Sequence, residues 1–324
     1  MFSELVDVKE NNIISIDYEI LSILLKDHTT KKNIIWATNM YERYGSSYSF
    51  KSQITIEQIT GRNGQVIRPR IKKSKKEQEQ RIKKKAEVFT PSWICNIQNN
   101  LADNSWFQKE NVFNKPDGVK WITNRNKILF PEGRSWVDYV KSLRLEISCG
   151  EAPYLVSRYD TVTGNSIPVI NRIGLLDRKI RIVSENTRSK DDWIKYVKEA
   201  YKSIYGYEWQ GDSLLIAREN LLYTYIDYYV DKFNEKPQID TIKEIAEIIS
   251  WNIFQMDGLK YVIPNSCKNE TIINYTLFGE EKETFECIGC QTNNYHNHNG
   301  IYVKIMNWET NRANKFINVL GRRK

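Results

Sequence analysis

No apolar run in the 324 residues approaches the roughly 18–20 residues that a membrane-spanning helix needs, so the sequence predicts no transmembrane protein. The N-terminus (MFSELVDVKENN) lacks a basic stretch followed by an apolar one, so no secretory signal is expected. The five cysteines are too few and too scattered for a disulfide scaffold, and they fit a reducing cytoplasm better. With 12% aromatic residues the chain is not disordered throughout. We therefore expect a folded cytoplasmic protein.

The excess of positive charge is confined to one short segment. Lys+Arg 48 and Asp+Glu 40 give the chain a net charge of +8, and residues 70–85 (RIKKSKKEQEQRIKKK) alone carry nine basic and two acidic side chains. Such a block attracts polyanions by releasing counterions, so DNA or RNA is the expected partner. The alternative is a solvated helix face, because Glu77–Arg81 and Glu79–Lys83 have the i,i+4 spacing of ion pairs. The lysines expected to contact DNA are Lys72, Lys73, Lys75, Lys76, Lys83, Lys84 and Lys85.

Three short apolar runs alternate with helical periodicity and predict strands of one parallel sheet. They lie in RLEISCG, SIYGYE and NIFQMD, and they end at or just before Glu146, Glu208 and Asp257. Ligands of such sheets bind at the carboxyl ends of the strands. We therefore expect these three acidic residues to face one binding site.

The residue types at the three strand ends suit a nucleoside. A glycine turn at Gly150 lets the backbone come close to a ligand, and a strand-end acid such as Glu208 can accept two hydrogen bonds from a ribose diol. A further acid, Asp257, can accept a hydrogen bond from the exocyclic amine of adenine. Each residue also has an ordinary alternative role, because glycines make turns and strand-end acids cap helices.

Four segments, in this order along the chain, resemble the cofactor motifs of the adenine-N6 DNA methyltransferases of restriction systems. AEVFTP (86–91) resembles the Phe-x-Thr-Pro motif that opens the cofactor site in that family, and LEISCGEAPYL (145–155) resembles its first S-adenosylmethionine motif. IYGYEWQGDSLLIARENLL (204–222) is similar to the second-strand motif with the ribose-binding acid. NIFQMDGL (252–259) is similar to the motif whose acid contacts the adenine amine. The resemblance covers about residues 86–263.

This resemblance implies an α/β fold, a Rossmann-like S-adenosylmethionine-dependent methyltransferase domain. The predicted parts are an N-terminal helical or mixed module over 1–85, the cofactor-binding domain over 86–264, and a Cys/His-containing insertion and connector over 265–324. The implied function is adenine-N6 methylation of double-stranded DNA in a bacterial restriction–modification system, beside a cognate restriction endonuclease. By resemblance the cofactor-binding residues are Phe89, Thr90, Pro91, Glu146, Cys149, Gly150, Ala152, Glu208 and Asp257.

The sequence departs from that family at its catalytic motif, an Asn or Asp followed by Pro-Pro-Tyr or Pro-Pro-Phe. None of the eight prolines is adjacent to another, so the resemblance assigns no catalytic residue to this chain. Ala152 also stands in place of the second glycine of the first motif, and Ile147 in place of a proline. We expect a truncated or split enzyme, with the missing motif on a second chain. The alternative is a non-catalytic DNA-binding or assembly subunit derived from such an enzyme.

Three of the five cysteines and two of the three histidines fall within 32 positions, 267–298. A Cys-x-x-Cys pair with a distant cysteine and a nearby histidine matches four-ligand zinc chemistry. The expected ligands are Cys267, Cys287, Cys290 and one histidine, with His296 preferred over His298. Such a zinc would be structural, since four protein ligands leave no open position. The alternative is a polar loop with incidental thiols, because the spacing from the first to the second cysteine is longer than in a standard pair.

Overall fold

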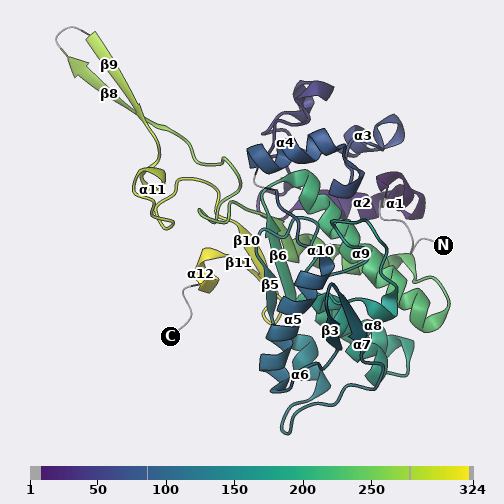
Figure 1. Cartoon of the computed structure of the whole chain (residues 1–324). Coiled ribbons are helices and arrows are strands. Elements are labelled where there is room, and N and C mark those ends of the chain that lie inside the picture. Colours follow the sequence, from purple (N-terminus) through teal and green to yellow (C-terminus); the bar gives the residue numbers. More distant parts are fainter. Residues whose placement is uncertain (1–8, 86, 277–278, 321–324) are drawn as a thin grey trace.

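The protein is a mixed α/β structure of helices and small sheets, seen here in a computed structural model that describes residues 9–85, 87–276 and 279–320 (Figure 1). The helices are α1 (Glu10–Ile16), α2 (Tyr18–Leu25), α3 (Ile56–Ile59), α4 (Lys75–Lys85), α5 (Ser92–Phe107), α6 (Trp136–Lys141), α7 (Leu175–Asn186), α8 (Lys190–Lys202), α9 (Gly211–Phe233), α10 (Ile239–Asn252), α11 (Ile288–Gln291) and α12 (Ile317–Leu320). The strands are β1 (Lys26–Asp27), β2 (Lys32–Asn33), β3 (Asn114–Asp117), β4 (Lys120–Thr123), β5 (Arg144–Glu146), β6 (Ile204–Glu208), β7 (Ile253–Gln255), β8 (Glu270–Thr276), β9 (Gly279–Phe285), β10 (Lys304–Asn307) and β11 (Arg312–Lys315).

The predicted parallel sheet is present as three strands in the order β5-β6-β7. Glu146 pairs with Gly206, and Glu208 pairs with Gln255, so the three strands end at one edge. The third strand ends two residues earlier than expected, at Gln255 instead of Asp257. The other sheets of the described residues are two-stranded and antiparallel.

Helix α9 begins directly beyond β6 and is buried along nearly its whole length. Its first residue is glycine because the N-terminal segment crosses there: the amide of Gly211 donates to the Trp36 carbonyl at 3.1 Å. A Cβ on Gly211 would lie 2.1 Å from the Ile35 carbonyl oxygen. Any larger residue would therefore push the N-terminal segment off the end of β6.

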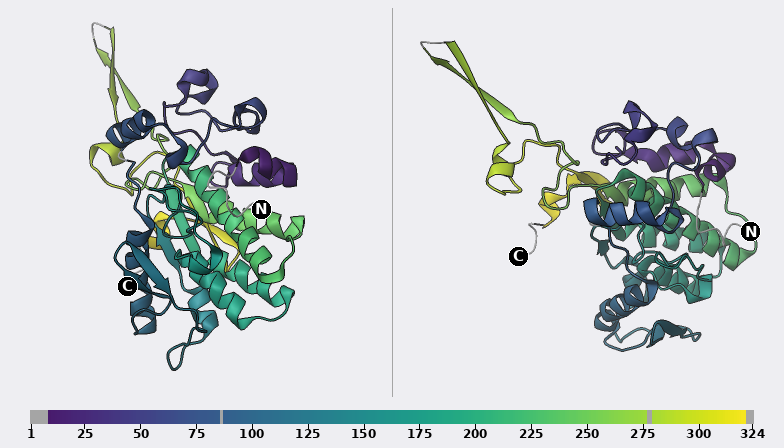
Figure 2. Two further views of the ribbon diagram at one scale, coloured as in Figure 1. Left: turned by 45° about the vertical axis from the view of Figure 1, so that its right-hand side comes forward. Right: turned by 45° about the horizontal axis from the view of Figure 1, so that its top comes forward.

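One hydrophobic core runs through the N-terminal segment and the region of the parallel sheet. It contains Leu21 and Trp36 from the first 85 residues together with Leu215, Ile245 and other residues of α9 and α10. Helix α2 packs on both of these helices. Figures 1 and 2 show α1 to α4 covering one end of the body that α5 to α10 build around the sheet.

The hairpin of β8 and β9 extends away from the rest of the chain in every view (Figure 2). It pairs antiparallel from Glu270 and Phe285 at its base to Thr276 and Gly279. All of its described side chains for which burial is known are exposed, so its place is fixed by what holds its base.

Within residues 9–85, 87–276 and 279–320, no helix combines the length and the apolar character needed to cross a membrane.

Candidate functional site

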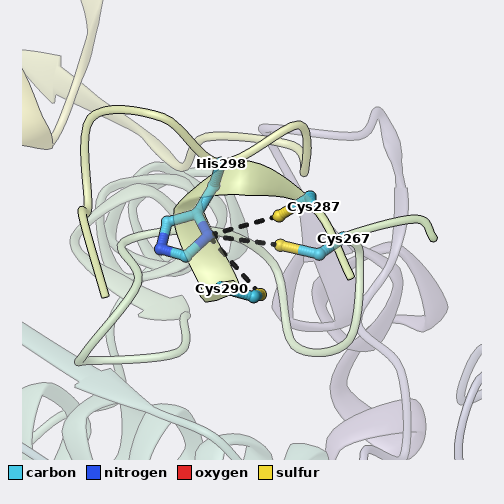
Figure 3. A group of neighbouring side chains, drawn as sticks. All are labelled: Cys267, Cys287, Cys290 and His298. Carbon is cyan, nitrogen blue, oxygen red and sulfur yellow. Dashed lines mark hydrogen bonds between the residues drawn. The ribbon is translucent and has the colours of Figure 1, made fainter. Parts of the chain in front are cut away.

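Three cysteines and one histidine converge at the base of the hairpin (Figure 3). Cys267 precedes β8, Cys287 caps the N-terminus of the short helix α11, and Cys290 lies within that helix. His298 comes from the loop that follows, and Figure 3 shows its ring pointing at the three sulfur atoms. The ligand atoms of all four residues lie within 4.8 Å of one another.

The spacing of these atoms suits a tetrahedral metal ion. Nδ1 of His298 is 3.7 Å from the Sγ atoms of Cys267, Cys287 and Cys290. In a tetrahedral zinc site, Zn–S bonds of about 2.3 Å and Zn–N bonds of about 2.0–2.1 Å separate sulfur from nitrogen by about 3.6 Å. The cluster could therefore hold a metal ion such as zinc.

The histidine that joins the three cysteines is His298, so the preference for His296 was wrong. His296 is exposed and its ring packs on Tyr295 at 4.4 Å between centroids, away from the thiols. His298 is buried, and its amide donates to the Tyr302 hydroxyl at 3.0 Å, which fixes the backbone of this loop. Sequence spacing alone left both histidines within reach of the cysteines.

The long spacing between Cys267 and Cys287 is also explained. The intervening chain forms the hairpin β8–β9, which leaves the cluster after the first cysteine and returns to it at the second. Gly289, between Cys287 and Cys290, allows the histidine loop to approach, because a Cβ there would lie 2.5 Å from the His298 amide nitrogen. The glycine and the hairpin together bring distant ligands to one point.

Charge at the cluster favours a cation. Burial opposes ionisation of Cys287, but hydrogen bonds from the Asn299 amide and the His298 ring outweigh it and lower the pKa of this thiol to about 6. Nζ of Lys260 lies 3.3 Å from Sγ of Cys290, and this hydrogen bond raises the lysine pKa. Three thiolates around a divalent ion leave one negative charge, which the ammonium of Lys260 is placed to balance.

A cavity of about 540 Å³ opens where β5 and β6 end. Its walls come from the segment after α4, from the loop after β5, from the turn after β6 and from one residue of the N-terminal segment. The lining residues are Phe50, Glu87, Val88, Phe89, Thr90, Glu146, Ile147, Ser148, Cys149, Gly150, Pro153, Tyr154, Glu208, Trp209, Gln210 and Ser213. Six of the nine residues expected to bind a cofactor are therefore brought together.

Two buried carboxyls lie in this cavity, and each holds the loop after β5. Glu146 accepts hydrogen bonds from the amides of Tyr154 and Leu155 at 3.3 and 3.1 Å. Burial raises its pKa to about 8 against the opposing effect of these two amides. Glu208 accepts hydrogen bonds from the amides of Gly150 and Gln210 at 2.9 and 3.1 Å, and burial raises its pKa as well.

The loop after β5 is tightly wound. Ser148, Gly150 and Ala152 have φ angles of 48°, 53° and 62°, all in the left-handed region. Glycine fits this conformation at position 150, where a Cβ would contact the Phe89 ring at 3.6 Å. The alanine at 152, in the place of the family's second glycine, adopts the same conformation and is fully buried.

Three of the expected cofactor residues do not line the cavity. Pro91 is the N-terminal cap of α5, and Ala152 packs in the core beneath the loop. Asp257 is buried in the turn after β7, where its Oδ1 accepts hydrogen bonds from the amides of Leu259 and Lys260 at 3.0 and 3.2 Å. Its carboxyl thus holds the turn that leads to the cluster of three cysteines and His298.

Three aromatic residues of the cavity, Phe50, Tyr154 and Trp209, were not among the expected cofactor-binding residues. Trp209 directly follows Glu208, and its ring meets that of Phe50 edge to face at 6.3 Å. The position of Trp209 directly after Glu208 in the sequence could have indicated that it lies in the same cavity. Phe50 gave none, because the crossing of the N-terminal segment over the sheet edge is a long-range contact.

The basic segment forms helix α4 and the turn before it. The expectation that Lys73, one of its lysines, is exposed to DNA was wrong. Lys73 is buried, and its Nζ lies 3.5 Å from Oδ2 of Asp212. Lys73 is therefore not one of the exposed lysines of this segment. Lys72, Lys75, Lys76 and Lys83 are exposed, while the side chains of Lys84 and Lys85 lie outside the described part of the chain.

Comparison with protein-family models, with curated proteins and with solved structures finds no match to this chain.

Proposed function

We propose that the chain binds S-adenosylmethionine in the cavity at the ends of β5 and β6 and serves as a component of an adenine-N6 DNA methyltransferase. The observation that carries the proposal is that residues of three separate motifs line this one cavity: Phe89 and Thr90, then Glu146, Cys149 and Gly150, then Glu208. The order β5-β6-β7 supports it further, because the motifs follow consecutive parallel strands of one sheet.

The residues of the cavity suit a cationic nucleoside. The carboxylate of Glu208 accepts hydrogen bonds from two amides and has further lone pairs that could accept from a ribose diol. The rings of Trp209 and Phe89 offer apolar faces, and the cavity volume lies within the range of small-molecule sites. When bound, the cofactor would supply an electrophilic methyl group whose leaving group is the sulfonium sulfur.

In this proposal the chain itself contributes binding and orientation. The loop after β5 would form one wall of the cofactor site beside Glu146, while the exposed lysines of α4 attract the DNA backbone. A Pro-Pro-Tyr or Pro-Pro-Phe stretch is not found in the printed sequence, so a second chain would supply the groups that polarise the adenine amine. The Cys267, Cys287, Cys290 and His298 cluster would hold a structural zinc ion beside the turn of Asp257.

Titration calorimetry with S-adenosylmethionine tests the proposal. We expect Glu208→Gln to weaken binding by about 10- to 100-fold, the effect of losing charged hydrogen bonds worth about 1.5–3 kcal/mol. The control is Glu132→Gln, which removes the same charge from an exposed loop and should leave the affinity unchanged. No binding by the unmodified chain would reject the cofactor. DNA affinity that is lost on neutralising Lys72, Lys75 and Lys76 would then favour the alternative, a non-catalytic DNA-binding subunit.

The high pKa of Glu146, about 8, makes cofactor binding depend on pH. Below pH 8 this carboxyl is mostly protonated, and a cationic ligand favours its ionised form. We expect affinity for S-adenosylmethionine to rise by up to about tenfold per pH unit between pH 6 and 8 and then to level off.

S-adenosylhomocysteine is the matched ligand for this measurement, because it carries the same amine without the sulfonium charge. The preference for S-adenosylmethionine over it should therefore grow with pH in the unmodified chain and stay constant in Glu146→Gln. A preference that grows equally in both proteins would contradict the role of Glu146.

A further inference from the structure

A second cavity, of about 450 Å³, lies between helix α4 and the N-terminal segment. Four cationic side chains and a single carboxylate line it: Arg43, Arg68, Lys73, Arg81 and Glu77. It adjoins the proposed cofactor cavity, because Nε of Arg81 lies 2.5 Å from Oε2 of Glu87, which lines that cavity. The positive charge of this pocket has no part in the function proposed above.

Two of the four cations form a fixed, buried wall. Nη2 of Arg81 lies 2.9 Å and Nζ of Lys73 3.5 Å from Oδ2 of Asp212, whose side chain is fully buried. The hydroxyl of Tyr41 donates to the same oxygen at 2.7 Å. One carboxylate oxygen thus holds both cations in place in the wall of the cavity.

The other two cations, Arg43 and Arg68, converge on Glu77. Nη2 of Arg43 lies 2.8 Å from Oε1 of Glu77, and Nη2 of Arg68 lies 3.2 Å from its Oε2. The hydrogen bond from Arg43, with help from the Ser74 amide and the charge of Arg68, lowers the pKa of Glu77 to about 2. Among the described residues, the buried Nε of Arg68 has no hydrogen-bond partner.

Two guanidinium groups that meet on one oxyanion have the geometry that binds phosphate. The carboxylate of Glu77 occupies the place where such an anion would sit. Its side chain reaches this place from the first turn of α4, where it also accepts a hydrogen bond from the Ser74 amide at 3.0 Å. An anion with two negative charges could therefore displace the Glu77 carboxylate from the two arginines.

We propose that this second cavity is a phosphate-binding site in which a phosphate group displaces the carboxylate of Glu77 from Arg43 and Arg68. The group would belong either to the backbone of a nucleic acid or to a free nucleotide. Both sources present the same oxygens to the arginines, and Lys73 and Arg81 add positive charge behind them. The proposal stands on this cavity alone and does not require cofactor binding.

Two substitutions with opposite expected effects test it. Glu77→Gln removes the competing charge but keeps the Ser-x-x-Gln form of the helix cap, so phosphate should bind more tightly, by about tenfold. Arg43→Gln with Arg68→Gln should weaken binding by at least about tenfold. Arg62→Gln is the control, because Arg62 is an exposed arginine outside the cavity.

Binding of inorganic phosphate and of adenosine monophosphate is measured by thermal shift and calorimetry. Binding of a 20-base-pair DNA duplex is measured by fluorescence anisotropy over a range of salt concentrations. Effects on all three probes indicate a free phosphate or nucleotide as ligand. Effects confined to the duplex, with a shallower salt dependence in the double variant, indicate a backbone phosphate. Equal affinities in all variants, or weaker binding in Glu77→Gln, would overturn the proposal, provided that circular dichroism shows the variants folded.

Discussion

Replacing His298 by alanine should abolish the retention of zinc, whereas replacing His296 should leave it unchanged. The loss removes one of four ligands that are already placed for a tetrahedral ion. Mutation of an outer-shell partner alone costs about 10- to 100-fold in metal affinity, so loss of a direct ligand should exceed about 100-fold. Metal analysis after dialysis, together with competition against a chromophoric chelator, measures the effect.

The His296→Ala variant is a matched control, because both histidines lie in the same loop and only one faces the thiols. Equal zinc content in the two variants would contradict the assignment. Hydrogen exchange gives a second readout of the same prediction. Removal of zinc by a chelator should expose the amides around Cys287 and His298, while those of α9 remain protected by the core.

Replacing Arg218 by methionine should lower the free energy of unfolding by at least about 3 kcal/mol. This side chain of α9 is buried, and burial lowers its pKa to about 10. Its guanidinium donates to the carbonyls of Ile253 at 2.8 Å, of Leu24 at 2.5 Å, and of Lys26 and Ser250 at 3.0 Å. The substitution would remove this donor from four carbonyls, which belong to α2, β1, α10 and β7.

Urea unfolding measures this effect as a shift of the midpoint at constant slope. The stability of Arg218→Lys should lie between that of the unmodified protein and that of Arg218→Met, because a lysine supplies three donors without the planar fork. Arg125→Met, in an exposed loop, is the control and should change stability by no more than about 0.5 kcal/mol. A loss in Arg218→Met as small as in this control would mean that the four carbonyls find other donors.

The parallel sheet and much of the proposed cofactor cavity could be predicted from the sequence, because both depend on local patterns. Short apolar runs ending in Glu146 and Glu208 identified β5 and β6, and the rule that ligands bind at strand ends placed both acids in one site. Gly150 followed from the turn directly after the first of these strands, whereas Phe89, far upstream in the sequence, was expected only from the resemblance of AEVFTP to a family motif. Periodicity and turn chemistry were sufficient for these strands and their ends, while the other cavity residues were expected from the family resemblance.

The predictions were wrong where the placement of a side chain depends on a residue that is distant in the sequence. The burial of Lys73 depends on Asp212, which follows 139 positions later, so a count of local charge could not reveal it. The choice of His298 depends on a close approach to Gly289. The side chain of Arg218 lies in the buried helix α9, and its role becomes clear only from the carbonyls that α2 and α10 bring to it.

The attachment of the β8–β9 hairpin at Cys267 and Cys287 has a consequence for how this region can vary. Both ends of the excursion are joined at one point, and its exposed residues add little to the core. Lengthening such a loop costs only about 0.6 kcal/mol for each doubling of its length. We therefore expect the chain between these two cysteines to tolerate replacement and insertion, while the fold of the remaining chain is unchanged.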